Sequence, residues 1–488
     1  MPKIMQLFRF FNYRPMLIMA LGALFGILIF SETYRDNNII AIIISLIVVI
    51  ISIIFKKRAI ALFAIAFFIF TFRTFIFYPS KTPEDGMRVI SGTVCKEGKT
   101  AVLNNAKINS VLFPGKILID SDVELSYGET VYAYGYVHFS NNMEDYLPHY
   151  YISNGIFAVT RIKRPYAVPN EPTIFTALSK IKLEIESSIN RNFINSAFIK
   201  GMILGDTADL NYETKLSVQN SGVAHILSLS GLHVSIIAGC LTYLFAPFNR
   251  WVRLFFITVF LTFYTAMTGF SPSLLRASIM FLCYLFGKCI YRRPDSLSSL
   301  SFAFLVIVAI NPYFIYSCSF ALSFCAMIGI ILISSALTRI SVPRKIRPFT
   351  NSISLSIGAS IGTFCPLSAY FKQIPLFSPI ANLVAIPAAS VALIFAFFGI
   401  AISFLYEPLI LPFSFIADFF SNIVLSTASA ISDLSFAVVS VPVVPIISGI
   451  LFSLSLFFVS GYSLKRKSIN FLCAVALAAI AILIYLTQ

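Results

Sequence analysis

The side chains best suited to chemistry in this chain lie in one fifteen-residue stretch, from Ala224 to Ala238. It holds two histidines, three serines and a glycine within a segment that is otherwise apolar enough to enter a membrane. Polar groups inside a bilayer cost free energy unless they find partners or border water. We therefore take this stretch as the first candidate for a functional site.

The spacing within this stretch leaves three interpretations open. On a continuous helix, side chains three or four positions apart are neighbours, so His225 would reach Ser228, and Ser230 would reach His233. These groups could satisfy the backbone of their own helix. They could instead line or gate a pore. The third interpretation makes Ser230 an intramembrane nucleophile with His233 as its base, which also requires an oxyanion hole and a water path.

A second cluster surrounds Arg276, which follows Gly269 and Pro272 inside the next apolar segment. A guanidinium within a membrane needs a carboxylate, carbonyl oxygens or a passing anion. We expect Arg276 to contact phosphate. The alternative is an arginine that extends to the membrane surface, or one that pairs with Asp206 or Asp209.

A third cluster consists of prolines and one asparagine in an otherwise apolar block. We expect kinked or discontinuous helices here, at Pro366 and within the segment from Pro375 to Pro387, which also holds Pro379 and Asn382. Such breaks are tolerated at membrane depth only against protein or a wet cavity, so they favour a passage over a rigid bundle.

The composition identifies an integral membrane protein. Of 488 residues, 58% are hydrophobic and 12% are charged, whereas soluble domains carry roughly 25% charged residues. The net charge of +15 lies in short clusters between apolar runs, which suits membrane orientation as well as an anionic partner. The eight cysteines show no CxxC spacing, and no histidines cluster near them. We therefore expect no metal site, cofactor or disulfide framework.

The elements that must position these clusters form a polytopic α-helical membrane protein of about 13 spans with a small external all-β domain. Residues 1–77 are the N-terminal transmembrane helices, and the basic run at 56–58 places the N-terminus in the cytoplasm. Residues 78–169 alternate in polarity, residues 170–222 form amphipathic interfacial helices, and residues 223–488 form the polytopic domain. We expect spans in this last part near 223–247, 252–269, 273–290, 297–316, 318–338, 349–371, 376–404, 410–430, 438–460 and 469–486, with Asp418 interrupting the eighth into a re-entrant segment.

Several motifs, in order, resemble those of ComEC-type competence proteins, the inner-membrane channels for DNA uptake. The first runs from His225 to Val234 and follows Leu204-Gly205-Asp206. Later matches are the Thr268–Ala277 segment, Asn311-Pro312 with Phe320–Phe324, and Ser378–Pro387. The resemblance implies channel-lining or motif roles for Asp206, His225, Ser228, Ser230, Gly231, His233, Tyr264, Arg276, Ser323 and Asn382.

The resemblance also implies an oligonucleotide-binding-type (OB-like) barrel at roughly 80–165 and a multi-pass location in the bacterial inner membrane. Tyr132, Tyr134 and Tyr136 are candidates for stacking on DNA bases. The alternative is that these alternating aromatics face the barrel core. Implied partners are single-stranded DNA, the lipid bilayer, a periplasmic DNA receptor, a separate nuclease and a cytoplasmic translocase.

Many relatives also carry a C-terminal metallo-β-lactamase-like domain, which we expect to be absent here because the four histidines of the chain cannot form an HxHxDH-type site. The sequence thus predicts a non-enzymatic channel that passes single-stranded DNA into the cytoplasm. Two alternatives stay open: an intramembrane hydrolase using Ser230 and His233, and a transporter of a small molecule or lipid precursor.

Overall fold

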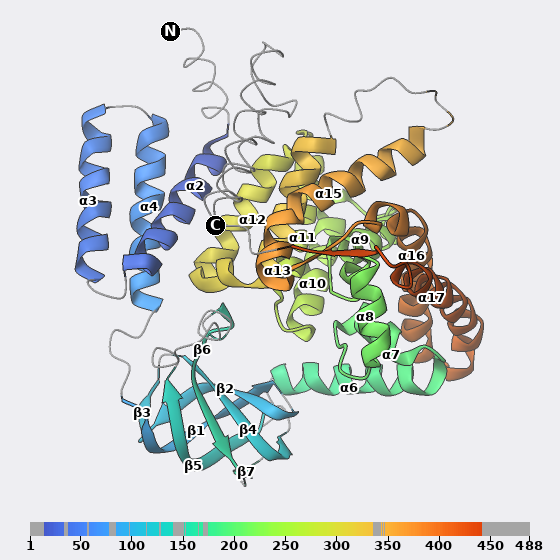
Figure 1. Cartoon of the computed structure of the whole chain (residues 1–488), viewed down its shortest axis with the longest axis horizontal. Helices are drawn as coiled ribbons and strands as arrows, with labels where there is room; N and C mark the ends of the chain where they lie inside the picture. The colour runs from blue at the N-terminus through green and yellow to red at the C-terminus, as the bar shows by residue number, and fades with distance from the viewer. Residues whose placement is uncertain are drawn as a thin grey trace. The chain divides into compact units, whose positions relative to one another are not determined.

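The computed structural model describes residues 14–441, except for gaps at 34–37, 56–57, 78–83, 97, 114, 126–127, 140–150, 152, 164, 169–173, 335–342, 344 and 346. The described residues form two compact units (Figure 1). The barrel unit comprises residues 14–183 and 301–317, and the helical unit comprises residues 184–300 and 318–441.

The barrel unit begins with three apolar helices, α2 (Pro15–Thr33), α3 (Asn38–Phe55) and α4 (Arg58–Phe77). α2 and α4 approach closely because α2 presents glycines to the α4 backbone. A Cβ atom at Gly22 would lie 2.4 Å from the Phe63 carbonyl oxygen, and one at Gly26 would lie 2.6 Å from that of Phe67. Small residues at such a crossing are typical of helix pairs in membranes.

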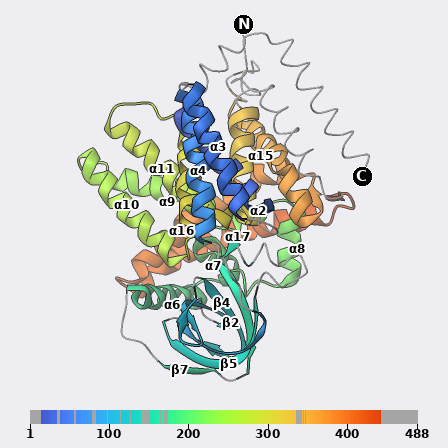
Figure 2. The ribbon, with the colours of Figure 1, turned by 90° about the vertical axis from the view of Figure 1, so that its left-hand side faces the viewer.

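The rest of this unit is a closed β-barrel (Figure 2). Its strands pair in the order β1-β2-β4-β6-β5, and β5 pairs back with β1 to close the barrel. β4 and β6 are parallel, and the other pairs around the barrel are antiparallel. This confirms the small β-barrel expected from the alternating sequence. The strands are β1 (Gly86–Lys96), β2 (Gly98–Ile108), β3 (Val111–Leu112, on β2), β4 (Lys116–Leu125), β5 (Thr130–Phe139), β6 (Ile156–Ile162) and β7 (Tyr166–Val168, on β5).

The helical unit contains most of the remaining elements, except that residues 301–317, with η3 and most of α12, belong to the barrel unit. Its first helix, α6 (Ile174–Asn192), begins in the barrel unit and enters this one at Glu184. The elements that follow α6 along the chain are α7 (Ser196–Leu204), α8 (Tyr212–Asn220), the 3-10 turn η2 (Ala224–Ile226), α9 (Gly231–Leu244), α10 (Arg250–Met267), α11 (Pro272–Cys289), α12 (Ser296–Ile310), η3 (Pro312–Tyr316), α13 (Cys318–Gly329), the π-helical turn η4 (Ile330–Ser334), α15 (Arg347–Phe371), β8 (Gln373–Pro375), α16 (Ser378–Ser403), η5 (Glu407–Leu409), α17 (Ile410–Ser432) and β9 (Val438–Ser440).

Five helices within the described residues are long and apolar enough to cross a membrane. They are α4, α10, α15, α16 and the continuous segment of η5 with α17. The chain is thus rich in membrane-type helices, while the count of about 13 spans is not confirmed. The expected spans at 438–460 and 469–486 lie outside the described residues, apart from β9.

The expected span at 223–247 is wrong. Its helix, α9, has only 14 residues, which rise about 21 Å against a hydrocarbon core of about 30 Å. The chain before it is a 3-10 turn followed by extended backbone at Ser230, whose φ and ψ are −128° and 177°. The apolar residues continue through this break, so hydropathy does not detect it.

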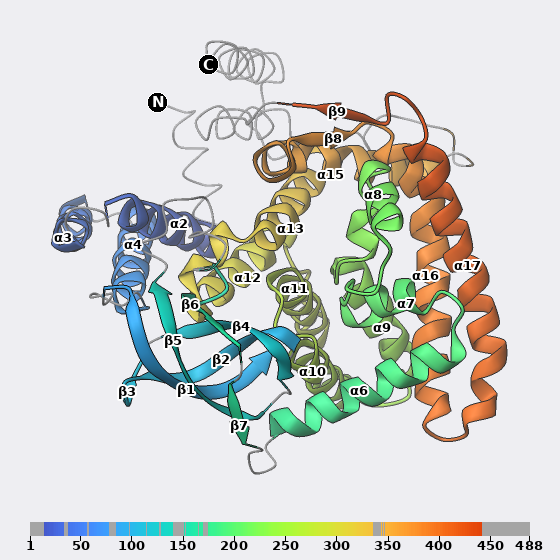
Figure 3. The ribbon, with the colours of Figure 1, turned by 60° about the horizontal axis from the view of Figure 1, so that its bottom comes forward.

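The expected interruption at Asp418 is also wrong, since α17 runs unbroken through it (Figure 3). The Asp418 carboxylate accepts the backbone N–H groups of Ile194 and Asn195, each at 2.9 Å. These donors lie where α7 begins and would otherwise be unsatisfied. Pro366 and Pro387 likewise lie inside the continuous helices α15 and α16, so no break occurs at either proline.

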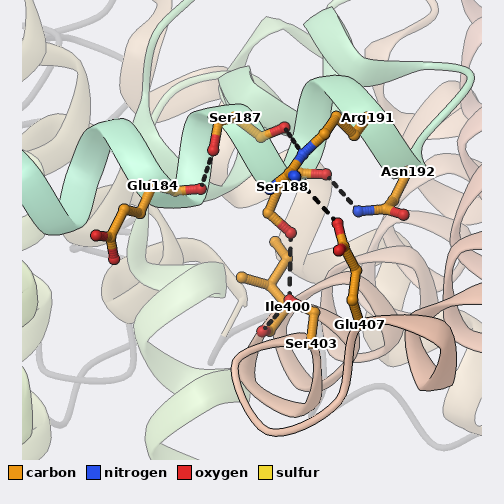
Figure 4. A network of polar contacts seen from close by, with 8 residues as sticks. All are labelled: Glu184, Ser187, Ser188, Arg191, Asn192, Ile400, Ser403 and Glu407. Atoms are coloured by element: carbon orange, nitrogen blue, oxygen red, sulfur yellow. Dashed lines mark hydrogen bonds and ion pairs between the residues drawn. The ribbon is translucent and has the colours of Figure 1, made fainter.

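Polar contacts fasten the second half of α6 to the turn between α16 and α17 (Figure 4). The Arg191 guanidinium lies 3.2 Å from the Glu407 carboxylate, and the Ser188 and Ser403 hydroxyl oxygens are also 3.2 Å apart. α6 therefore crosses the end of the α16–α17 hairpin.

Candidate functional site

Ser230 and His233 form a capping box at the start of α9. The Ser230 backbone N–H donates to His233 Nδ1 at 3.2 Å, and the Leu232 N–H donates to the Ser230 hydroxyl oxygen at 3.3 Å. The serine and the histidine thus each satisfy a backbone donor that a helix start leaves unpaired. This geometry explains why the helix begins at Gly231.

The same two side chains touch each other, as the spacing predicts. Ser230 Oγ lies 3.1 Å from His233 Nδ1, a distance that would allow a base to take the hydroxyl proton. The Nδ1 lone pair is shared with a backbone N–H, however, which makes it a structural acceptor. The expected contact between the His225 ring and Ser228 is not formed, because the Ser228 hydroxyl donates to the His225 carbonyl oxygen at 3.3 Å.

Arg276 extends from α11 toward the start of α9 and is only 8% exposed. Its Nε donates to the Ser323 hydroxyl on α13 at 2.7 Å, and Ser323 lies 3.0 Å from the Ser273 hydroxyl. Nη1 contacts the Met280 sulfur at 3.7 Å. Two serines and a thioether do not neutralise a guanidinium, so these contacts position the charge without balancing it.

Gly231 brings the start of α9 next to this guanidinium. A Cβ atom at Gly231 would lie 3.3 Å from Arg276 Nη2. Backbone N–H groups and the dipole at a helix start favour negative charge. The structure therefore brings Gly231 and Ser323 next to the buried Arg276, with the Ser230–His233 capping box at the same helix start.

Neither aspartate proposed as a partner reaches Arg276. Asp209 pairs with Lys200, and the Asp206 carboxylate accepts the Ala208 N–H at 2.9 Å. Within the residues that the structure describes, no carboxylate lies at ion-pair distance from Arg276. The ion-paired alternative for Arg276 is therefore not observed there.

Tyr264 and Asn382 lie in separate contacts. The buried Tyr264 hydroxyl donates to the Ile203 carbonyl at 2.8 Å, which ties α10 to the end of α7. The Asn382 amide donates to Ser356 at 2.9 Å and to Ser378 at 3.3 Å, and its buried Oδ1 accepts from no donor in the described part of the chain. Among the described residues, neither side chain bonds to the Arg276 cluster.

Sequence reasoning did not select Ser356 and Ser378 as site residues. The Ser378 hydroxyl also lies 3.5 Å from the carbonyl oxygen of Gly222, whose φ of +79° requires glycine. Serines in apolar helices commonly bond to their own backbone, so nothing in their spacing distinguishes these two.

The three candidate tyrosines of the barrel all point outward from β5. Tyr132, Tyr134 and Tyr136 are 51%, 63% and 45% exposed, whereas Val131 and Val137, on either side of them, are buried. The core-facing alternative is therefore wrong. Tyr166 on β7 pairs with Tyr132, and Val89 on β1 pairs with Tyr134, so these residues extend the exposed face.

No group of three histidine, cysteine, aspartate or glutamate side chains in the described part of the chain could hold a metal ion. The groups that the candidate site offers are the Arg276 guanidinium and the hydroxyl groups of Ser273 and Ser323.

Comparison with known proteins places this region in context. A family model described as "Competence protein" matches residues 202–467. The chain is 28% identical over 196 residues to ComE operon protein 3 of Bacillus subtilis, covering 40% of this chain and 24% of that protein. It is 26% identical over 265 residues to Recombination protein 2 of Haemophilus influenzae, covering 50% and 33% respectively.

A third relative, an uncharacterized protein of Aquifex aeolicus, is 29% identical over 182 residues, covering 37% of this chain and 41% of that protein. The chain thus spans between about a quarter and two fifths of these relatives' lengths. No solved structure matches.

Proposed function

Because the chain belongs to the competence protein family, whose model matches more than half of its residues, we propose that it passes single-stranded DNA across the bacterial inner membrane into the cytoplasm during natural transformation. A periplasmic DNA receptor, a separate nuclease and a cytoplasmic translocase are the partners that such a task requires.

The buried guanidinium of Arg276 carries this proposal. An uncompensated charge in a membrane protein is costly to maintain, and its presence usually marks an ion pathway or a ligand. A DNA strand presents one negative phosphate per nucleotide, and a negative partner is what Arg276 lacks among the described residues. Arginine is also the side chain whose planar fork matches phosphate oxygens.

The sparseness of the cluster supports conduction over tight binding. Ser273 and Ser323 surround one arginine, where a high-affinity nucleic-acid site would show many cations. A passage must bind its cargo weakly enough to release it. One phosphate contact at a time would allow the strand to advance.

Short helical segments before α9 in the chain also favour a passage. α7 and α8 have nine residues each, and η2 has three. Irregular backbone at membrane depth occurs where it is buried in protein or lines a water-filled path.

The barrel supplies a second feature suited to single strands. A small closed barrel of five strands is typical of OB folds, which bind single strands by aromatic stacking beside basic residues. The exposed tyrosines of β5 suit this role. Exposed cations also occur on the barrel, at Lys107 on β2 and at Lys163 after β6, while Arg161 on β6 lies 3.6 Å from the Asp120 carboxylate.

Replacement of Arg276 tests the proposal. We expect R276Q to lower transformation by about 10- to 100-fold, since a hydrogen bond to a charged group contributes about 1.5–3 kcal/mol. R276K, which retains charge without the planar fork, should lie between R276Q and wild type. The measurement is transformation frequency in cells whose own copy is deleted, with membrane protein levels matched by immunoblot.

R191Q is the matched control, because Arg191 is an exposed arginine on α6 that pairs with Glu407. It should transform as wild type. Wild-type transformation by R276Q at equal protein level would remove Arg276 from the passage, and full transformation in the deletion strain would remove the DNA assignment altogether.

An intramembrane hydrolase is the second candidate, favoured by the 3.1 Å contact between Ser230 Oγ and His233 Nδ1. Both atoms already serve the capping box, and a nucleophile would have to break these bonds to react. We therefore place DNA passage first.

A further inference from the structure

Basic residues gather where α10 begins and α11 ends, away from the Arg276 cluster. Arg250 and Arg253 lie in the first turn of α10, Lys288 lies in the last turn of α11, and Arg292 and Arg293 follow it. We call these five residues the basic helix-end cluster. Two contacts join the helix ends: the Cys289 thiol donates to the Arg250 carbonyl at 3.4 Å, and the Trp251 and Phe286 rings lie 6.2 Å apart.

Two of these cations are held over aromatic rings. The Arg250 guanidinium carbon lies 4.2 Å from the Tyr291 ring centre, and Lys288 Nζ lies 4.4 Å from that of Tyr284. Both distances are within the range of cation–π attraction. The rings thus fix the positions of two charges without neutralising them.

The acidic side chain that follows the cluster along the chain bonds to the start of the next helix. Asp295, the next acidic residue along the chain, accepts the Ser298 N–H at 3.0 Å and the Ser298 hydroxyl at 2.8 Å at the start of α12. Within the described parts of the chain, none of the five cations pairs with a carboxylate. The cluster therefore presents a net positive surface.

Exposed apolar side chains flank the cluster along both helices. Trp251, Phe255 and Phe286 are 47%, 63% and 49% exposed. α10 is long and apolar enough to span a membrane, and tryptophan and tyrosine concentrate where such helices meet the headgroup region. Cations at the helix ends and large apolar groups beside them match the two parts of a phospholipid.

We propose that the basic helix-end cluster binds the headgroup of an acidic phospholipid, with the acyl chains against Trp251 and Phe286. Clusters of lysine and arginine at the ends of membrane helices attract anionic lipids. A single-stranded nucleic acid fits this surface less well, because its bases need open aromatic faces. Here Arg250 and Lys288 cover the faces of Tyr291 and Tyr284. This inference does not depend on the proposed DNA passage.

Lipid binding to the purified full chain tests the proposal. Native mass spectrometry of the detergent-solubilised protein, titrated with phosphatidylglycerol or phosphatidylcholine, should show tighter binding of phosphatidylglycerol. R250Q/K288Q should weaken that binding about 30-fold, since each cation near an anionic surface contributes about fivefold. R250K/K288R, which keeps both charges, should recover most of the affinity.

The matched control is R191Q/K372Q, which removes two exposed cations from other parts of the helical unit, Arg191 on α6 and Lys372 between α15 and β8, and should bind as wild type. If R250Q/K288Q does not fold, R292Q/R293Q carries the same test with exposed side chains. Equal binding of the two lipids by wild type would overturn the proposal, as would unchanged binding by both cluster variants. Displacement of phosphatidylglycerol by a 20-nucleotide single strand, or by millimolar inorganic phosphate, would also overturn it and assign the cluster to those anions.

Discussion

At the scale of single residues, Ser230 shows how one spacing can satisfy two chemical interpretations. A serine followed three positions later by a histidine fits a nucleophile with its base, and it fits a helix cap equally well. The observed bonds run to backbone N–H groups of Ser230 and Leu232. The cap is therefore the role that the geometry supports directly.

Ser230→Ala should remove the cap and preserve passage. We expect a loss of about 1 kcal/mol in the free energy of unfolding, the usual value for an N-cap serine. DNA uptake should persist at a reduced level that follows protein abundance. Thermal unfolding in detergent and transformation frequency provide the two measurements.

Ser230→Thr is the control, because its hydroxyl can cap the helix as well. A well-folded S230A protein with no uptake at all would contradict the capping role and favour a reacting hydroxyl.

At the scale of elements, Asp418 shows that a charge in an apolar helix can belong to a neighbour. The carboxylate lies in α17 but satisfies the start of α7, and Asn195 Nδ2 donates back to the Asp418 carbonyl at 3.3 Å. α7 leads to the short segments that precede the candidate site. Asp418 therefore helps to fix the position of those segments.

Asp418→Ala should destabilise the helical unit by about 1–3 kcal/mol, because two part-buried backbone N–H groups would lose their charged acceptor. Asp418→Asn keeps one carbonyl oxygen and should lose about half as much. Asp433→Ala is the matched control on the same helix, since Asp433 is exposed at the end of α17. Thermal unfolding in detergent measures all three; equal stability of D418A and D433A would remove the role that we give to Asp418.

At the scale of the whole molecule, the barrel unit and the helical unit each offer a feature suited to a single strand. The barrel presents aromatic rings, and the helical unit presents a buried cation. Stacking depends little on salt, whereas phosphate contact depends on it strongly. The two contributions can therefore be separated in one binding assay.

Tyr134→Ala in the full chain should lower the affinity for a single-stranded oligonucleotide by about 5- to 100-fold, the usual range for losing one stacked base, with an unchanged salt slope. Lys163→Gln should instead reduce the slope of log affinity against log salt by about 0.7. Fluorescence anisotropy at several salt concentrations gives both values. The control is Tyr212→Ala, because Tyr212 is an exposed tyrosine on α8. An equal loss of affinity in Y212A and Y134A would contradict the stacking role of Tyr134.

The sequence predicts regular elements better than it predicts their interruptions. Alternating polarity reveals the barrel strands, and long apolar runs locate α10, α15 and α16 within a few residues. The break before Gly231 is hidden because the flanking residues are equally apolar. The sequence did not decide whether the β5 tyrosines face the barrel core or the outside, because both faces of that strand carry residues that can be buried.

The partners of Arg276 could not be read from the sequence for a different reason. Ser323 lies on another helix, and proximity between separate helices depends on packing that no local pattern encodes. The same is true of Asp418 and the start of α7.

The shortness of α9 has an electrical consequence. Its 14 residues rise about 21 Å, roughly two thirds of a hydrocarbon core of about 30 Å. An α9 that entered a bilayer at Leu244 and ran along the membrane normal would therefore hold Gly231 and the adjacent Arg276 inside the core. In that placement, an anion at Arg276 would gain or lose on the order of 1–2 kcal/mol per charge at 100 mV, so the resting potential of the cell would act on whatever occupies that position.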